Sequence, residues 1–156
     1  MNDIWISVNN DAGIKELMEA YCGFHDSCIT GISYTSGSYV DDNKSMIGCM
    51  DACGHKLVLT LNSQWKDPLA LLFEGVMKFN VVGYEENYFC EILGAYLSFC
   101  TDLTGKTRDD KLIVWSNNEC FKPESYSEEK IISANGKNST YIVAQKLSWR
   151  FMKPEE

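Results

Sequence analysis

The densest group of reactive side chains in the sequence is the run Cys22-Gly23-Phe24-His25-Asp26-Ser27-Cys28, which combines a histidine, a carboxylate, a hydroxyl and two thiols. In a hydrolase, Ser27 or one of the thiols would act as nucleophile, His25 as base, and Asp26 would orient the base. Side chains of adjacent residues point in different directions, however, and catalytic partners usually come from distant segments. We therefore expect His25 and Asp26 to satisfy backbone groups where a helix meets a strand.

Zinc binding is a second chemistry that these residue types suggest. The pattern Cys49-x3-Cys53-x-His55, joined to Cys22-x2-His25, would supply the thiolate and imidazole ligands that zinc prefers. Structural zinc sites generally use two short knuckles, and only Cys49 and Cys53 have that spacing. The spacing therefore predicts no metal site.

The acidic loop at residues 41–43 could hold calcium only if its oxygens converged. It lacks both the alternating acidic spacing and the closing glutamate of a calcium loop. The glycine-rich patterns that cradle phosphates are absent from the sequence as well. We expect no cofactor.

Three of the four tryptophans divide into two groups by their surroundings. Trp115 and Trp149 lie inside apolar runs and are expected in the core. Trp65 lies between Gln64 and the turn-like run Lys66-Asp67-Pro68, where exposure is expected. Exposed tryptophans beside charged residues are typical anchors of protein interfaces.

The charge of the chain is strongly negative. Among 156 residues, 14 are Lys or Arg and 22 are Asp or Glu, which gives a net charge of -8 and a pI near 4.8. Nucleic acid is therefore a poor partner, because affinity for phosphates depends on clustered basic residues. A basic protein is a better one, since complementary potentials accelerate encounter. The candidate acidic contacts are Asp41, Asp42, Glu85, Glu86, Asp109 and Asp110.

One amphipathic helix is predicted near the start of the chain, at about residues 11–22. Apolar residues recur there at helical spacing, and Asn10 or Asp11 can cap the first turn. Gly23 suits the left-handed position that ends a helix. The residues of the apolar face are Ile14, Leu17, Met18, Tyr21 and Cys22.

The rest of the chain alternates between apolar and polar residues, which is the pattern of half-buried strands. The clearest local signal is Asn135-Gly136, a hairpin turn joining residues 130–134 to a final strand at 140–151. In that strand one face would carry Tyr141, Val143, Leu147, Trp149 and Phe151. Other strands are predicted at 28–34, 57–61 (in a hairpin with 46–50), 69–81 as one strand or two joined at Gly75, 93–99, and 112–115, the last covered on both faces.

These elements predict a single domain over residues 1–156 of mainly β (α+β) class. One N-terminal helix and about seven or eight mostly antiparallel strands would form a sandwich or a partly closed barrel. The sequence shows neither a signal peptide nor an apolar stretch of membrane-spanning length. Seven cysteines, an odd number, fit reduced and mostly buried thiols in a cytoplasmic protein rather than a disulfide framework.

Two short motifs carry a resemblance to a known group of proteins. Phe24-His25-Asp26-Ser27 leads into a strand, and Phe73-Glu74-Gly75-Val76 comes later in the chain. The chain thereby resembles small bacterial β-rich proteins with F-H-D-[SA] and F-x-G-V motifs, some of which are similar to immunity proteins of polymorphic toxin systems. The resemblance implies a protein that neutralises a toxin by binding it, and it supplies no catalytic residues.

The lead hypothesis is a non-enzymatic binding protein that covers a basic toxin domain, with Trp65 and the acidic pairs as contacts. The motif residues Phe24, His25, Asp26, Phe73, Gly75 and Val76 are expected to be structural. A sandwich or barrel that binds a small apolar ligand is the first alternative. An enzyme that uses His25 and Asp26 is the second. The sequence does not specify the oligomeric state.

Overall fold

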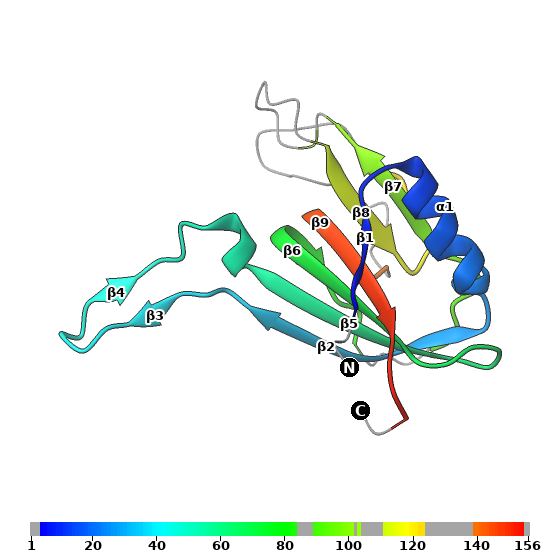
Figure 1. The fold of residues 1–156 in the computed structure, drawn as a ribbon, viewed down its shortest axis with the longest axis horizontal. Helices are drawn as coiled ribbons and strands as arrows, with labels where there is room; N and C mark the ends of the chain where they lie inside the picture. Colours follow the sequence, from blue (N-terminus) through cyan, green and yellow to red (C-terminus); the bar gives the residue numbers. More distant parts are fainter. Residues whose placement is uncertain (1–3, 84–88, 102, 104–110, 124–138, 155–156) are drawn as a thin grey trace.

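The computed structural model describes residues 4–83, 89–101, 103, 111–123 and 139–154. The predicted class is confirmed: one helix accompanies an antiparallel sheet that is not closed into a barrel (Figure 1). The elements are β1 (Ile6–Val8), α1 (Asp11–Ala20), β2 (Ser27–Thr35), β3 (Tyr39–Val40), β4 (Met46–Ile47), β5 (Lys56–Ser63), β6 (Leu69–Asn80), β7 (Tyr96–Cys100), β8 (Leu112–Ser116) and β9 (Tyr141–Phe151), with single 3-10 turns at Cys22–Phe24 and Ala52–Gly54.

The main sheet has seven strands in the order β2-β5-β6-β9-β8-β7, with β1 also paired to β9. Strand β9 pairs with β6 along its whole length. Its other edge is shared by β8 in the first half and β1 in the second. Strand β1 was not predicted, because it has only three residues and contains no alternating run of useful length.

Helix α1 begins where predicted and ends earlier. The Asn10 side chain accepts a hydrogen bond from the Gly13 amide at 3.0 Å, which caps the first turn. The helix ends at Ala20 rather than at residue 22 because Cys22 and Gly23 adopt left-handed conformations (φ 52° and 62°). Leu17 is fully buried against the sheet.

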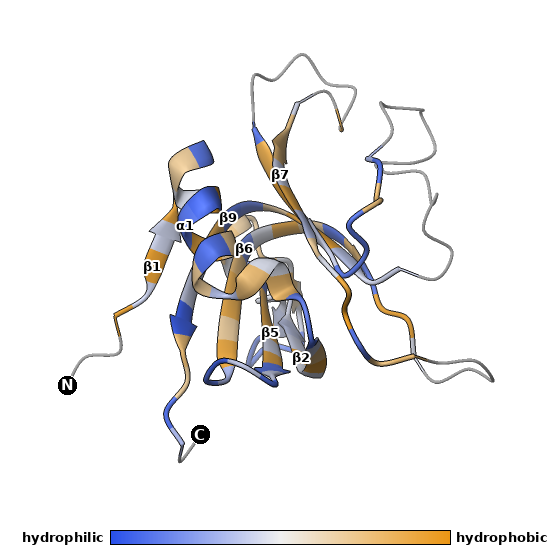
Figure 2. Ribbon diagram, turned by 90° about the vertical axis from the view of Figure 1, so that its right-hand side faces the viewer, coloured by the Kyte–Doolittle hydropathy of each residue, from blue (hydrophilic) through white to orange (hydrophobic). Residues whose placement is uncertain are grey.

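The main hydrophobic core lies between α1 and one face of the sheet (Figure 2). On β5, Leu57, Leu59 and Leu61 alternate with more exposed residues, as the pattern predicted. All five residues of β8 are buried, which confirms a strand covered on both faces. A smaller core on the other side of β8 and β9 contains Leu103, Leu112, Val114, Phe121, Tyr141 and Val143.

The predicted common face of β9 is wrong. Tyr141 and Val143 pack in the smaller core, whereas Leu147 and Trp149 pack in the main one. The register of the β6–β9 pair shifts between Val76 and Lys78. The alternation of β9 itself breaks at Gln145 and Lys146, which are both exposed, so the side chains that face the main core change from Ile142 and Ala144 to Leu147 and Trp149.

The predicted hairpin between residues 46–50 and 57–61 is also wrong. Strand β4 pairs with β3 in a separate two-stranded sheet, and β5 lies between β2 and β6. The long run at 69–81 forms one strand, β6, that ends at Asn80. Residues 130–138, which include the predicted Asn135-Gly136 turn, lie outside the described residues.

The thiols are less buried than expected. All seven cysteines are free; Cys22, Cys90 and Cys120 are exposed, and the other four are partly buried. No helix in the described part of the chain is long and apolar enough to span a membrane.

Candidate functional site

The motif turn, residues Cys22–Asp26, connects α1 to β2 in an unusual backbone conformation. Cys22, Phe24 and Asp26 have positive φ angles of 52°, 65° and 56°. For residues other than glycine this region costs of the order of 1–3 kcal/mol each, so the surrounding structure must hold it. The Ser27 hydroxyl donates to the Phe24 carbonyl at 2.6 Å, which is one of the contacts that do so.

The Phe24 side chain anchors the motif turn in the main core. Its ring is fully buried and lies edge-on to Tyr21 at 5.2 Å and to Trp115 at 5.8 Å. Edge-to-face pairs of this kind add to the stabilisation that burial provides. Phe24 therefore holds the strained backbone in place, while His25 on the next position is exposed.

Asp26 joins three segments of the chain. Its amide donates to the Ile92 carbonyl, and its own carbonyl accepts from the Gln64 amide, both at 3.0 Å. Its carboxylate accepts from Trp65 Nε1 at 2.7 Å and lies 3.0 Å from His25 Nδ1. The Trp65 hydrogen bond is the main cause that lowers the pKa of Asp26.

Trp65 is exposed, at 66% of its full accessible area, and the Asp26 hydrogen bond fixes its indole nitrogen. The same carboxylate is in contact with Glu91. Hydrogen bonding to Asp26 is the first cause that raises the pKa of Glu91. Exposed aromatic and acidic groups thus meet at this end of the sheet.

The nucleophile–base contact of a hydrolase is not formed in the part of the chain that the structure describes. Ser27 donates to the Phe24 carbonyl instead of contacting His25. The His25 ring contacts the Asp26 carboxylate, and the His25 amide donates to the Cys22 carbonyl at 3.1 Å. No described hydrogen bond joins the His25 ring to the thiol of Cys22 or Cys28.

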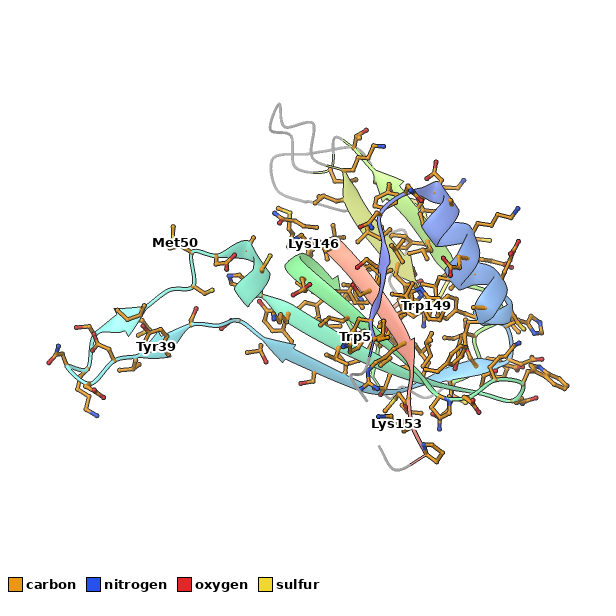
Figure 3. All side chains as sticks on the ribbon, viewed as in Figure 1. Trp5, Tyr39, Met50, Lys146, Trp149 and Lys153 are labelled. Atoms are coloured by element: carbon orange, nitrogen blue, oxygen red, sulfur yellow. The ribbon has the colours of Figure 1, made fainter. Side chains whose placement is uncertain are left out.

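The second region is the arm, defined as residues 38–50, which contains β3, β4 and the turn between them. It extends away from the main sheet, and Tyr39 and Met50 point outward from it (Figure 3). Tyr39, Val40, Met46 and Met50 expose 60%, 55%, 84% and 97% of their areas. Large apolar side chains with this exposure usually mark an interaction site when they cluster.

The tip of the arm is an ordered acidic turn. One Asp41 carboxylate oxygen accepts from the amides of Asn43 and Ser45, both at 2.9 Å. Lys44 takes a left-handed conformation there, with φ 65°. Because Asp41 serves the turn, the Asp42 side chain is the acidic group that the tip presents to solvent.

The arm base, formed by Gly37, Cys49, Gly54 and His55, fixes the arm to the sheet. His55 Nε2 contacts the Cys49 carbonyl at 3.1 Å, and His55 Nδ1 contacts the Tyr34 hydroxyl at 3.1 Å. A Cβ on Gly37 would lie 2.9 Å from Cys49 Sγ, and a Cβ on Gly54 would be closer still. At both glycines the Cys49 side chain occupies the space that a Cβ would need, and the φ of 73° at Gly37 further favours glycine there.

The zinc ligands weighed in the sequence do not converge. Cys22 and His25 precede β2, whereas Cys49, Cys53 and His55 lie near its far end, where Thr35 pairs with Lys56. Cys53 Sγ instead accepts from Lys146 Nζ at 3.7 Å. Within the described residues, no group of three or more potential ligands could hold a metal ion.

The predicted contact residues fall in different places. Asp41 and Asp42 lie on the arm, which joins the sheet at the start of β5, whereas Trp65 follows the end of β5. Strand β5 alone spans roughly 23 Å at about 3.3 Å per residue. The two therefore do not form one continuous patch. Glu85, Glu86, Asp109 and Asp110 lie outside the described residues.

The second motif, Phe73-Glu74-Gly75-Val76, contributes a buried side chain, a backbone hydrogen bond and a close backbone approach. Phe73 is fully buried, and the Val76 amide donates to the His55 carbonyl at 3.1 Å, which ties β6 to the arm base. Gly75 has φ 65°, and a Cβ there would approach Gln145 within 2.8 Å.

The apolar side chains of the arm were missed in the sequence. The sequence did contain a signal for them. Two short apolar pairs, Tyr39-Val40 and Met46-Ile47, flank a polar turn and are too short to form strands that span the core. Comparisons with protein-family models, curated proteins and solved structures yield no match for this chain.

Proposed function

We propose that the chain is a non-enzymatic protein-binding domain that uses its arm to cover a basic protein partner. The observation that carries this proposal is the exposure of Tyr39, Val40, Met46 and Met50 on a projecting two-stranded element (Figure 3). An arm of this shape can insert into a groove of a partner. Burial of its apolar side chains would then supply the main binding free energy.

The contacts at the arm base preorganise the arm for binding. Its close packing at Gly37 and Gly54 and the two His55 contacts restrict the direction in which the arm projects. A restricted element loses less conformational entropy when it binds, and affinity improves accordingly.

The negative charge of the chain favours a basic partner over an acidic one. The chain has a net charge of -8, and Asp42 is exposed at the arm tip beside the apolar side chains. A basic surface would be attracted to it, and an acidic one repelled. The resemblance of the two motifs to those of immunity proteins supports a toxin as the partner, and seven free cysteines suit a reducing cytoplasm.

The test uses a variant, Tyr39→Ser/Met46→Ser/Met50→Ser, in which three exposed apolar side chains of the arm become polar. The wild type and the variant are each used to capture partners from a lysate of the native host. The captured protein is then purified and its affinity for both forms is measured by calorimetry. We expect a basic protein that binds the wild type in a one-to-one complex and the variant at least about tenfold more weakly, since hot-spot truncations often cost more than 1 kcal/mol.

A matched control replaces exposed apolar residues elsewhere, Ile4→Ser/Val81→Ser. This control should bind as the wild type does. A reconstituted partner that binds the arm variant and the wild type equally, or a partner that is acidic, would overturn the proposal.

A further inference from the structure

A cavity of about 400 Å³ lies beside the motif turn, at the opposite end of β5 from the arm. Its walls come from the start of β2, the end of β5 and the segment before Ile92. This volume is within the range of small-molecule sites in proteins. The described residues that line it are Asp26, Ser27, Cys28, Asn62, Ser63, Gln64, Phe89, Cys90 and Glu91.

Two carboxyl groups meet in this cavity. Asp26 and Glu91 interact closely enough to move each other's pKa in opposite directions, down for Asp26 and up for Glu91. The two groups are hydrogen-bonded to each other, which requires a proton on one of them. Once that proton is lost, the two carboxylates repel each other unless a cation neutralises them. His25 Nδ1 lies 3.0 Å from Asp26 Oδ1, and the His25 charge acts to lower the pKa of both carboxyl groups.

The cavity wall supplies no basic group for the pair. Among its described residues none is Lys or Arg. Among the other polar side chains of the lining, Asn62 and Gln64 carry amide oxygens that can accept hydrogen bonds from a charged donor. The cavity is therefore complementary to a positive ligand in both charge and hydrogen bonding.

Two exposed aromatic rings accompany the carboxyl groups. Phe89 lines the cavity with 68% of its area exposed. Trp65 is held at its edge by the 2.7 Å hydrogen bond to Asp26, which leaves the ring faces of the indole available. Cations bind over aromatic faces, and an apolar stem next to the cation adds contact with Phe89.

We propose that this cavity binds an ammonium or guanidinium group carried on an apolar stem. The group replaces the proton that Asp26 and Glu91 share, the amide oxygens of Asn62 and Gln64 accept hydrogen bonds from its N–H groups, and Phe89 contacts the stem. The same chemistry is offered by a lysine or arginine side chain of a protein and by a free diamine. The site is separate from the arm, so it can be tested without a partner.

The experiment follows the Trp65 indole resonance by NMR while the full chain is titrated with 1,4-diaminobutane, with a lysine-containing pentapeptide, and with the same peptide carrying norleucine. We expect a saturable shift with at least one of the charged probes and none with the norleucine peptide. Stronger binding of the peptide would identify a protein side chain as the source, and stronger binding of the diamine a small molecule. Absence of a shift with both charged probes, or an equal shift with norleucine, would overturn the proposal.

Two variants complete the test. Glu91→Gln removes one charge from the cavity and should weaken the charged probe at least about fivefold. Glu16→Gln makes the same change on the exposed face of α1 and should leave affinity unchanged. Equal affinity of Glu91→Gln and wild type would overturn the role of the carboxyl pair. The Tyr39→Ser/Met46→Ser/Met50→Ser variant should respond as wild type, which keeps this result distinct from that of the arm.

Discussion

The motif turn and the arm lie at the two ends of β2 and differ in what holds them. Phe24 ties the motif turn into the main core, and that core maintains three positive φ angles outside glycine. The arm makes its contacts at its base, and its own apolar side chains are exposed. The conspicuous sequence motif therefore marks a turn that the fold requires. The arm, which we propose as the binding element, has no recognisable motif in the sequence. Substitutions in the two regions should therefore differ in their effect on stability.

The largest expected effect is that of Phe24→Ala. The substitution removes a fully buried ring that contacts Tyr21 and Trp115, so the free energy of unfolding should fall by about 3–5 kcal/mol. Chemical denaturation at neutral pH measures it. Phe89→Ala, at an exposed ring, should change stability by less than about 0.5 kcal/mol. Similar losses for the two variants would mean that the motif turn is not held by the core.

Gly75→Ala should have the next largest effect. It places a Cβ at a positive φ angle and 2.8 Å from Gln145, close to where β6 meets the arm base. We expect a loss of about 1–3 kcal/mol. Gly48→Ala on the arm, where no atom lies within 4 Å, is the control and should cost far less. Equal losses of stability for the two alanine variants would contradict the close approach at Gly75.

Trp65→Phe should change the pH dependence of stability. Without the indole donor, the pKa of Asp26 rises toward its ordinary value. A lowered pKa in the folded state stabilises the protein above the unfolded value of about 3.9, and this contribution disappears as pH falls through the folded value. The wild type should therefore exceed the variant in stability at pH 7, with the gap closing in acid. Carboxyl NMR titration of Asp26 checks the shift directly, and an unchanged midpoint contradicts it.

The smallest effect on stability is expected from the arm. Tyr39→Ser/Met46→Ser/Met50→Ser alters side chains that are mostly in water already, so its free energy of unfolding should remain within about 0.5 kcal/mol of wild type. Thermal and chemical denaturation measure it. A loss comparable to that of Phe24→Ala would show that these residues serve folding.

The sequence predicted the fold class well because burial leaves a periodic trace. The leucines of β5 alternate, β8 is apolar throughout, and Asn10 caps the helix it precedes. The faces of β9 were mispredicted because its alternation breaks at Gln145 and Lys146, next to the left-handed Gly75 of the neighbouring strand β6. Nothing local in the sequence of β9 reports such a break.

The candidate site was only partly predictable. Exposure of Trp65 followed from its charged neighbours, but its hydrogen bond to Asp26 joins residues 39 positions apart. The pairing of β4 with β3 rather than β5 decided that Met46 would be exposed. Strand pairings of this kind determine which side chains are exposed, and they depend on the arrangement of the whole sheet.

The most direct test of the proposed binding role is the dissociation constant of the reconstituted complex, compared between the wild type and Tyr39→Ser/Met46→Ser/Met50→Ser. The account predicts a basic partner whose affinity falls at least about tenfold in the variant while the variant's stability is retained. Equal dissociation constants for the two forms would contradict it.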